Sequence, residues 1–143
     1  MIQLESFATL NAEAQALFEA HAAEVTTNGP VALDLGAYQE LERRGALVVV
    51  TARKAGKIIG YLVLKLGRDI HFDQRVAASD MFFVTSEARR SGVGRELISK
   101  ALAHLDWLGI DRVFFGMKIR HQFRKLLRSE GFAPEEEIWV KEL

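Results

Sequence analysis

The stretch from Asp80 to Leu105, DMFFVTSEARRSGVGRELISKALAHL, constrains the fold more than any other part of the sequence. It predicts a strand at Met81–Val84, a turn rich in Arg and Gly at Thr85–Gly94, and an amphipathic helix after the turn. The helix is predicted from spacing, because apolar residues recur at a period near 3.6 while charged residues take the opposite side. The apolar side comprises Val93, Leu97, Ile98, Ala101, Leu102 and Leu105. A strand, a turn and a helix in this order indicate an α/β domain.

The turn has the features of an anion site. Gly92 and Gly94 lie where the turn becomes the helix, so no side chain there hinders a ligand from approaching the backbone. The first amides of a helix have no partners within it, and the helix dipole places partial positive charge at that end. Arg89, Arg90 and Arg95 add full positive charge. Together these features predict a site for a phosphate.

The pattern of this loop narrows the choice of phosphate ligand. Arg89–Gly94 reads R-x-x-G-x-G, without the Lys-Ser or Lys-Thr that ends a Walker A loop. A dinucleotide fingerprint needs a third Gly where this sequence has Leu97. With a hydrophobic strand before it and an amphipathic helix after it, the pattern resembles the coenzyme A pyrophosphate loop of the GNAT superfamily of N-acetyltransferases. The alternative interpretation is a tight turn that contains Gly and solvated arginines.

Composition limits the classes of function. The chain has 143 residues, which suits one domain over 1–143 with a single filled core. Its formal net charge is zero, which gives no overall electrostatic case for nucleic acid or a membrane surface. The absence of Cys excludes a disulfide framework, thiolate metal ligands and a cysteine acyl-enzyme. The N-terminus has no secretion signal and no apolar run is long enough to span a bilayer, so we expect a soluble, cytoplasmic protein.

Turn signals and hydrophobic patterns predict the remaining elements. A short strand is predicted at Ile2–Ser6, then a helix from an N-cap at Asn11 to about Val25, and a loop at Thr26–Pro30. The elements that follow are a helix from Asp34 to Arg44, strands at Ala46–Arg53 and Lys57–Leu66, a polar loop or ragged strand end at Arg68–Ala77, a buried strand at Asp111–Met117, a helix at Arg120–Glu130 and a last strand at Glu137–Lys141. The order β-α-α-β-β-β-α-β-α-β predicts an antiparallel meander that leads into a parallel crossover.

That order is similar to the order of the GNAT superfamily, so the resemblance covers nearly the whole chain. It implies that Phe82–Val84 pairs with the pantetheine arm of CoA and that Asp111–Met117 diverges from its neighbour to admit the thioester. Leu126–Phe132, LLRSEGF, resembles the terminal L-Y-x-x-x-G-F segment of the family. The implied fold is a GNAT-like mixed sheet with a splay between the two central parallel strands. The implied acetyl-CoA site comprises Phe82, Phe83, Val84, Arg89, Arg90, Ser91, Gly92, Val93, Gly94 and Arg95.

A narrower resemblance concerns the short patterns outside the loop. A-x-K-A-G-K-I-I-G-Y and D-x-F-F-V resemble stretches of short GNAT proteins that occur in tailed-phage genomes. This resemblance concerns origin and adds nothing on the acceptor.

Acetyl transfer to an amine needs a base and a site for the oxyanion. A lysine-type amine has a pKa of about 10.4, so a base or a water chain must take its proton. Glu24, His71 and Asp80 are the candidate bases. Asp80 begins the central strand, where it either faces the acceptor cleft or hydrogen-bonds to a loop. The amides near Phe83 and Val84 are the expected donors to the oxyanion.

The sequence departs from the family at the usual position of the acid. The tyrosine four residues before the Gly of the terminal Gly-Phe is Leu127 here. His121 is the candidate substitute, and the simpler interpretation is a solvated His on a basic helix. A thiol has a pKa of about 8.5, so departure as thiolate costs little and an acid is the most dispensable of the catalytic aids.

Two other charged groups have a functional and an ordinary interpretation. His21 and Glu24 share a helix face and either frame the acceptor pocket or form a surface pair. No third ligand at useful spacing accompanies them, so no metal site is predicted.

The basic segment Lys118–Arg128 either receives the 3′-phosphate of CoA, an acidic protein or nucleic acid, or is a solvated face balanced by Glu135–Glu137. Trp139 is a candidate for the core or for a dimer edge.

The resemblance thus implies an acetyl-CoA-dependent N-acetyltransferase that passes acetyl directly to a primary amine of a protein or small molecule. Direct transfer is expected because Cys is absent and no Ser-His-Asp set is identifiable. The alternatives are a CoA-binding protein without catalysis and an interaction protein that uses its basic face on nucleic acid. The intact R-x-x-G-x-G argues against the second alternative, and a homodimer is a candidate assembly.

Overall fold

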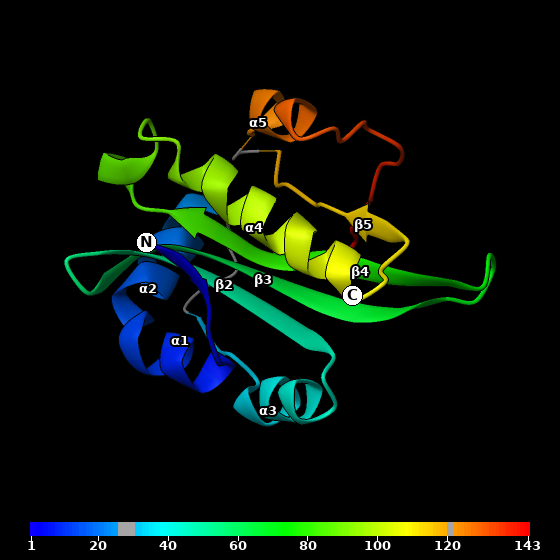
Figure 1. Cartoon of the computed structure of the whole chain (residues 1–143), viewed down its shortest axis with the longest axis horizontal. Coiled ribbons are helices and arrows are strands. Elements are labelled where there is room, and N and C mark those ends of the chain that lie inside the picture. Colours follow the sequence, from blue (N-terminus) through cyan, green and yellow to red (C-terminus); the bar gives the residue numbers. More distant parts are fainter. Residues whose placement is uncertain (26–30, 120–121) are drawn as a thin grey trace.

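Residues 1–25, 31–119 and 122–143 are described by a computed structural model, in which helices cover both faces of a central sheet (Figure 1). The elements in chain order are β1 (Ile2–Leu4), α1 (Phe7–Glu13), α2 (Gln15–Val25), α3 (Leu35–Arg43), β2 (Leu47–Lys54), β3 (Lys57–Asp69), β4 (Gln74–Val84), the 3₁₀ turn η1 (Ser86–Ala88), α4 (Val93–Trp107), β5 (Arg112–Phe114) and α5 (Arg124–Ser129). The predicted loop at Thr26–Pro30 lies outside the described residues.

The sheet has five strands in the order β1-β2-β3-β4-β5. The first four strands are antiparallel neighbours, and β4 pairs in parallel with β5. A parallel pair needs a crossover connection, which α4 supplies by packing its apolar side on the sheet. The predicted α/β fold with a mixed sheet is confirmed.

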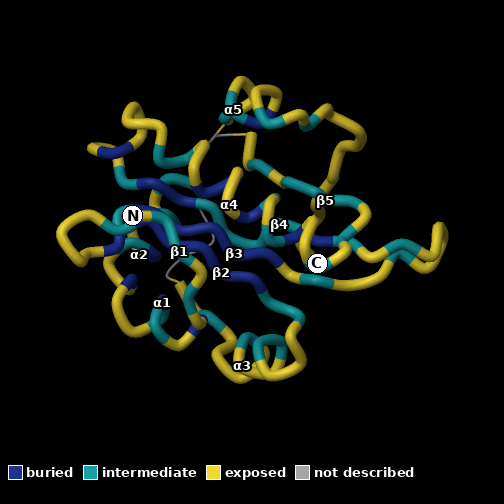
Figure 2. Tube along the Cα trace, viewed as in Figure 1, coloured by how far each residue is buried: buried dark blue, intermediate teal, exposed yellow. Residues whose placement is uncertain are grey.

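Each face of the sheet has its own hydrophobic core, because successive strand residues point to opposite faces. In β3, Leu62 and Leu64 point to the face that α4 covers, while Tyr61 and Val63 point to the face that α1 and α2 cover. The central strands are accordingly buried over most of their length, while turns and outer helix faces are exposed (Figure 2).

The first helical region begins earlier than predicted and is divided in two. Asn11 is not an N-cap: α1 begins at Phe7, and its cap is Ser6, whose side chain accepts a hydrogen bond from the Thr9 amide (3.1 Å). A second helix, α2, begins at Gln15. The predicted cap of α3 is correct, since Asp34 accepts from the Ala37 amide (3.1 Å). Ser6 and Asn11 are both residue types that cap helices, so the sequence alone did not separate them.

The segment Arg68–Ala77, predicted as a polar loop or a ragged strand end, forms the outer part of a strand hairpin. β3 and β4 continue past the core with Asp69 opposite Gln74, and only four residues, Ile70–Asp73, form the turn. Arg68 pairs with Asp73 across it. The hairpin extends into solvent, so its strands carry polar residues, and backbone pairing rather than burial holds them together.

The C-terminal elements are shorter than predicted. β5 covers Arg112–Phe114 within the expected Asp111–Met117, and α5 covers Arg124–Ser129 within the expected Arg120–Glu130, of which residues 120–121 lie outside the described part of the chain. The strand predicted at Glu137–Lys141 does not form, although its residues alternate as a strand would. Alternation supplies a pattern but no partner, and the segment has no strand beside it in the described part of the chain.

Candidate active site

The two central parallel strands separate halfway along β4. Pairing with β5 covers only Val76–Ala78, after which β5 ends at Phe114 while β4 continues to Val84. At the point of separation the Gly116 amide donates to Ser79 Oγ (2.9 Å) and holds the departing chain beside β4. The predicted splay is therefore present, and within the described residues no strand lies beside the far half of β4.

The backbone of β4 presents hydrogen-bonding groups to this gap. The Thr85 amide donates to Ile59 in β3 (2.9 Å). The direction of backbone groups alternates along an antiparallel strand, so those of Phe82 and Val84 point away from β3 and into the gap. The amide of Phe83 points to β3 instead. Of the two amides expected to hold an oxyanion, only that of Val84 therefore faces the gap.

Aromatic rings hold the two strands apart on the α4 side. The ring of Phe82 lies edge-on to Phe115 (centroids 5.3 Å apart) and to Phe123 (5.1 Å). Phe115 in turn contacts Phe132 near the end of α5 (5.7 Å). These rings pack between β4 and the chain that follows β5, so the divergence of the strands is part of the packed core.

The gap leads to the N-terminus of α4, which begins after Gly92. Gly92 has φ +88°, has no atom within 4 Å of where a Cβ would lie, and gives the helix no side-chain cap. The first amides of α4 can therefore donate hydrogen bonds to a ligand from outside the chain. Gly94 has another role, because a Cβ there would lie 3.2 Å from Leu126 and 3.4 Å from Phe82. It allows α4 to pack closely on these residues.

The arginines of the loop differ in their partners. Arg89 Nε donates to the Val84 carbonyl (3.0 Å), and its guanidinium pairs with Glu24 in α2 (2.7 Å). Arg95 Nε donates to Glu130 (2.7 Å), and Arg90 is exposed. Arg89 thus ties the loop to α2 and is directed at a carboxylate rather than at an open anion site.

Asp80 occupies a bulge beside the point where the strands separate. Val63 is paired with Met81 and Leu64 with Ser79, so Asp80 is the extra residue of β4. A bulge bends the strand and redirects a side chain, and bulges are frequent beside active sites. The Tyr38 hydroxyl in α3 donates to one oxygen of Asp80, and the other oxygen lies 3.1 Å from Lys65 Nζ. Burial first, and the hydrogen bond to Asp80 second, raise the pKa of Tyr38 well above its ordinary value.

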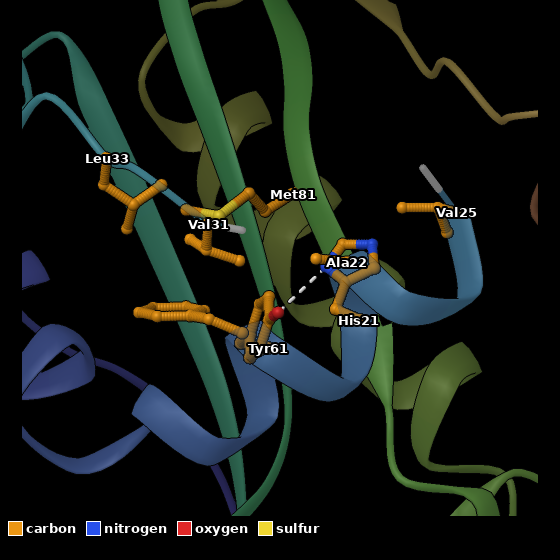
Figure 3. Close-up of a pocket in the computed structure, with 8 residues that line it drawn as sticks. His21, Ala22, Val25, Val31, Leu33, Tyr61 and Met81 are labelled. Carbon is orange, nitrogen blue, oxygen red and sulfur yellow. Dashed lines mark hydrogen bonds between the residues drawn. The ribbon is translucent and has the colours of Figure 1, made fainter. Parts of the chain in front are cut away.

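A second polar pair lies on the α2 face of the sheet. Tyr61 Oη and His21 Nδ1 share a hydrogen bond of 2.9 Å, and the His21 ring stacks on Phe83 (5.1 Å). Burial raises the pKa of Tyr61 well above its usual value, so its hydroxyl stays protonated. Figure 3 shows the two side chains pointing toward each other at an apolar hollow. The hollow is lined by Phe18, His21, Ala22, Val25, Val31, Leu33, Tyr61 and Met81.

The other predicted catalytic residues are not gathered at Asp80. His71 is exposed in the β3–β4 turn. Asp80 lies six positions beyond Gln74, the first residue of β4, so His71 is at least about 20 Å from Asp80 along the strand. Glu24 is engaged by Arg89 as described above. His121 lies outside the described residues. Leu127 is buried in the core (8% exposed), so no proton donor occupies that position.

One acidic residue near the C-terminus, Glu135, pairs with a residue outside the basic segment that follows β5. Glu135 pairs with Arg112 at the start of β5. Arg124 and Lys125 are exposed on α5. The predicted neutralisation of Lys118–Arg128 by Glu135–Glu137 is therefore wrong for Glu135.

Sequence reasoning missed three residues that shape the site. Tyr38 and Tyr61 come from different elements and meet β4 residues only through folding, so no local pattern signals them. Ser79 directly precedes Asp80, and only the pairing of β4 with the chain after β5 shows its role. The position of Tyr61 in an apolar strand was a partial signal, because a buried phenol usually has a hydrogen-bond partner.

Neither a metal cluster nor a membrane-spanning helix occurs among the described residues. No group of three or more His, Cys, Asp or Glu side chains there could hold a metal ion. None of the helices in residues 1–25, 31–119 and 122–143 is long and apolar enough to cross a membrane.

Comparison with protein families identifies the class. Residues 11–132 match the profile of the acetyltransferase (GNAT) family. The chain therefore belongs to this family and is an acetyltransferase, as the resemblance implied. A comparison with curated protein sequences finds no match.

Solved structures share the fold over the whole chain. An aminoglycoside acetyltransferase from an uncultured soil metagenomic sample, in complex with sisomicin, is 19% identical with a TM-score of 0.77, covering 100% of this chain and 94% of that one. A ribosomal-protein-alanine N-acetyltransferase from Brucella melitensis biovar Abortus 2308 is 17% identical with a TM-score of 0.75, covering 100% and 99%. Glucosamine-6-phosphate N-acetyltransferase from Arabidopsis thaliana is 13% identical with a TM-score of 0.73, covering 99% and 98%. At these identities the likeness concerns the fold alone.

Proposed function

We propose that this protein transfers acetyl from acetyl-CoA directly to a primary amine. The observation that supports the proposal is the open edge of β4, which leads from the bulge at Asp80 to the uncapped N-terminus of α4 at Gly92. A strand edge offers alternating donors and acceptors to an extended amide-containing arm, and a helix N-terminus favours phosphate. One continuous path thus suits the pantetheine arm and the pyrophosphate of CoA.

The residues of this path have separate tasks. The backbone groups of Phe82 and the amide of Val84 face the gap and would hold the amides of pantetheine, whereas the Val84 carbonyl already accepts from Arg89. The first amides of α4, from Val93 onward, would hold the pyrophosphate, with the exposed Arg90 placed in the same loop. Acetyl-CoA supplies an activated acyl carbon that an amine can attack.

Asp80 is the residue that we assign to the acceptor amine. Its carboxylate already lies 3.1 Å from the ammonium group of Lys65, which is itself a primary amine. The site thus has the charge and geometry to hold one ammonium, and an incoming amine would exchange with Lys65. Tyr38 keeps the carboxylate in place through its hydroxyl. A carboxylate near the amine also provides the first acceptor for its proton.

The departing thiol has no acid at the usual position, because Leu127 is part of the core. A thiol pKa of about 8.5 allows departure as thiolate near neutral pH. We therefore assign no general acid.

The acceptor is either a protein or a small molecule. Its entrance is on the side of α2 and α3, where Asp80 and the apolar hollow around Tyr61 are found. The similar structures carry names of aminoglycoside, protein and amino-sugar acetyltransferases, so the fold accommodates acceptors of each size.

Calorimetric titration with acetyl-CoA and with CoA tests the cofactor site. Gly92→Glu introduces a side chain and a negative charge where the pyrophosphate would bind, and we expect it to abolish detectable binding. Gly56→Glu is the matched control, because Gly56 also has positive φ (+77°) and open space, but lies in the β2–β3 turn. Equal loss of binding in both variants, or no binding by the unmodified protein, would contradict the proposal.

A further inference from the structure

Asp80 and Met81 are consecutive residues of β4 whose side chains lie on the same face of the sheet. Successive strand residues ordinarily point to opposite faces. The bulge at Asp80 interrupts this alternation, so Asp80 meets Tyr38 of α3 while Met81 packs against the core on the α1 and α2 face. A carboxylate and an apolar side chain are therefore neighbours on one surface of β4.

Met81 also forms one wall of the apolar hollow beside Tyr61 and His21 (Figure 3). The hollow has a volume of about 170 Å³. An apolar cavity of about 150 Å³ is large enough to hold benzene. The hollow thus has the size of one branched aliphatic or aromatic side chain, and it begins one residue from the carboxylate that we assign to the acceptor amine.

Lys65 lies on the other side of that carboxylate. Along the paired strands β3 and β4 the order is Tyr61, Met81, Asp80 and Lys65. The two members of the ion pair are held unequally: the side chain of Asp80 receives the Tyr38 hydroxyl and is 16% exposed, whereas that of Lys65 is 49% exposed. Lysine has a flexible four-carbon stem, so Lys65 can move while Asp80 stays in place.

The number of ion pairs decides which amine suits this arrangement. An amine without a negative charge replaces one pair by another and leaves Lys65 without its carboxylate. An acceptor with both an ammonium and a carboxylate replaces the single pair by two, one at Asp80 and one at Lys65. An α-amino acid carries these two groups and its side chain on one carbon, which matches the three neighbouring features of the site.

We propose that the acceptor is a free α-amino acid with an apolar side chain, which places its ammonium at Asp80, its carboxylate at Lys65 and its side chain in the hollow. The inference rests on the proposed function and narrows its acceptor. In the transfer, the C–N bond of the amide forms and the C–S bond of the thioester breaks. The ammonium loses two protons, of which one passes through Asp80 to solvent and the other is taken up by the departing thiolate.

Calorimetric titration at neutral pH in the presence of CoA compares leucine with two probes that each lack one group. Leucinamide has the ammonium and the side chain of leucine without the carboxylate, and glycine has both charges without the side chain. We expect leucine to bind about tenfold more tightly than leucinamide, because the latter cannot form a charged hydrogen bond with Lys65. It should also bind at least about tenfold more tightly than glycine, which leaves the hollow unfilled.

Lys65→Met tests the second ion pair, because it removes the positive charge and keeps a long side chain. We expect leucine to bind about tenfold more weakly to this variant. Leucinamide should bind as well as before or better, since no lysine competes for Asp80. Lys57→Met is the matched control, because Lys57 is exposed at the start of β3 and should leave the preference for leucine unchanged. Circular dichroism verifies that both variants are folded.

Three outcomes overturn the inference: none of the three probes binds, leucine binds no more tightly than leucinamide or glycine, or the preference for leucine over leucinamide survives in Lys65→Met. If other amines are acetylated while any of these holds, the proposed function stands and the inference fails. Absence of CoA binding contradicts the proposed function instead. The three probes are then titrated without CoA, and the same outcomes decide whether the site selects an apolar amino acid.

Discussion

At the scale of single residues, the proposed acceptor site depends on one extra residue in β4. The bulge brings Asp80 into contact with Tyr38 and Lys65. A regular strand would send neighbouring side chains strictly to alternate faces. The bulge interrupts this alternation at the point where β5 departs, so a carboxylate lies beside the gap between the two strands.

Asp80→Asn tests the role of this carboxylate. The amide keeps the size of the side chain but removes its charge, and a hydrogen bond to a charged group contributes about 1.5–3 kcal/mol. We expect kcat/KM for the amine to fall about 10- to 100-fold, with the larger part in KM for the amine and little change in KM for acetyl-CoA. Steady-state kinetics with both substrates varied separate these effects.

Asp73→Asn is the matched control, because Asp73 lies in the exposed β3–β4 turn. It should leave both KM values unchanged. An Asp80→Asn variant with unaltered kinetics for every amine that the protein accepts would remove Asp80 from the mechanism.

A second residue, Gly60, permits the close approach of β3 to β4 and α4. A Cβ at Gly60 would lie 3.0 Å from the Phe83 carbonyl oxygen and 3.2 Å from Leu97. Because the carbonyl belongs to the backbone of a paired strand, it cannot move aside without disturbing the ladder. We expect Gly60→Ala to lower the free energy of unfolding by about 1–3 kcal/mol, measured by urea denaturation.

Gly67 provides the comparison within the same strand. No atom lies within 4 Å of a Cβ built there. Gly67→Ala should therefore leave stability unchanged or raise it slightly, because Ala restricts the unfolded chain more than Gly does. Equal effects of the two substitutions would show that close packing at Gly60 is unimportant.

At the scale of elements, Arg53 joins the N-terminal strand and helix to β2. Its guanidinium donates to Glu5 (2.8 Å) and to Glu13 (2.6 Å). Burial acts to raise the pKa of Glu5, but hydrogen bonds from Arg53 and Gln3 outweigh burial, and the pKa is lowered from 4.5. Ionised Glu5 therefore stabilises the folded state above pH 4.5, and this contribution is lost as the pH falls through the lowered pKa.

Glu5→Gln makes that contribution measurable. We expect the difference in unfolding free energy between the unmodified protein and the variant to be about 1–3 kcal/mol at neutral pH. The difference should shrink as the pH falls below 4.5. Urea denaturation across the pH range gives it directly. Glu19→Gln, on the exposed side of α2, is the control and should show no such trend; a difference that grows toward low pH would contradict the assignment.

The elements also show which predictions a sequence supports. The unit from β4 to α4 was predictable because strand, loop and helix are contiguous and each has a local signal. The β3–β4 hairpin was not, because its outer half is held by backbone pairing and has no buried face. The strand predicted at Glu137–Lys141 has the pattern of a strand, but a pattern cannot supply a neighbour. The break at Ala14 between α1 and α2 likewise has no strong signal in the sequence.

At the scale of the whole molecule, the proposed active site lies beside the gap between β4 and β5, which can be reached from both faces of the sheet. The proposed cofactor path follows the open edge of β4 to α4, whereas the proposed acceptor side is built from α2, α3 and the bulge. The loop of the cofactor path could be recognised in the sequence because its residues, Arg89–Gly94, are adjacent. The acceptor side could not, since Tyr38 is 42 residues from Asp80 and His21 is 40 residues from Tyr61.

The most direct measurement is acetyl transfer itself, followed as free thiol and as the mass of the acetylated product. The panel of acceptors would contain an aminoglycoside, a peptide with an N-terminal alanine and an amino-sugar phosphate. We predict that thiol release requires an amine and equals the amount of acetylated amine, that the protein itself gains no acetyl group, and that Gly92→Glu abolishes transfer while Gly56→Glu does not. Acetylation of the protein without any amine, or transfer that persists unchanged in Gly92→Glu, would contradict direct transfer from acetyl-CoA bound at the N-terminus of α4.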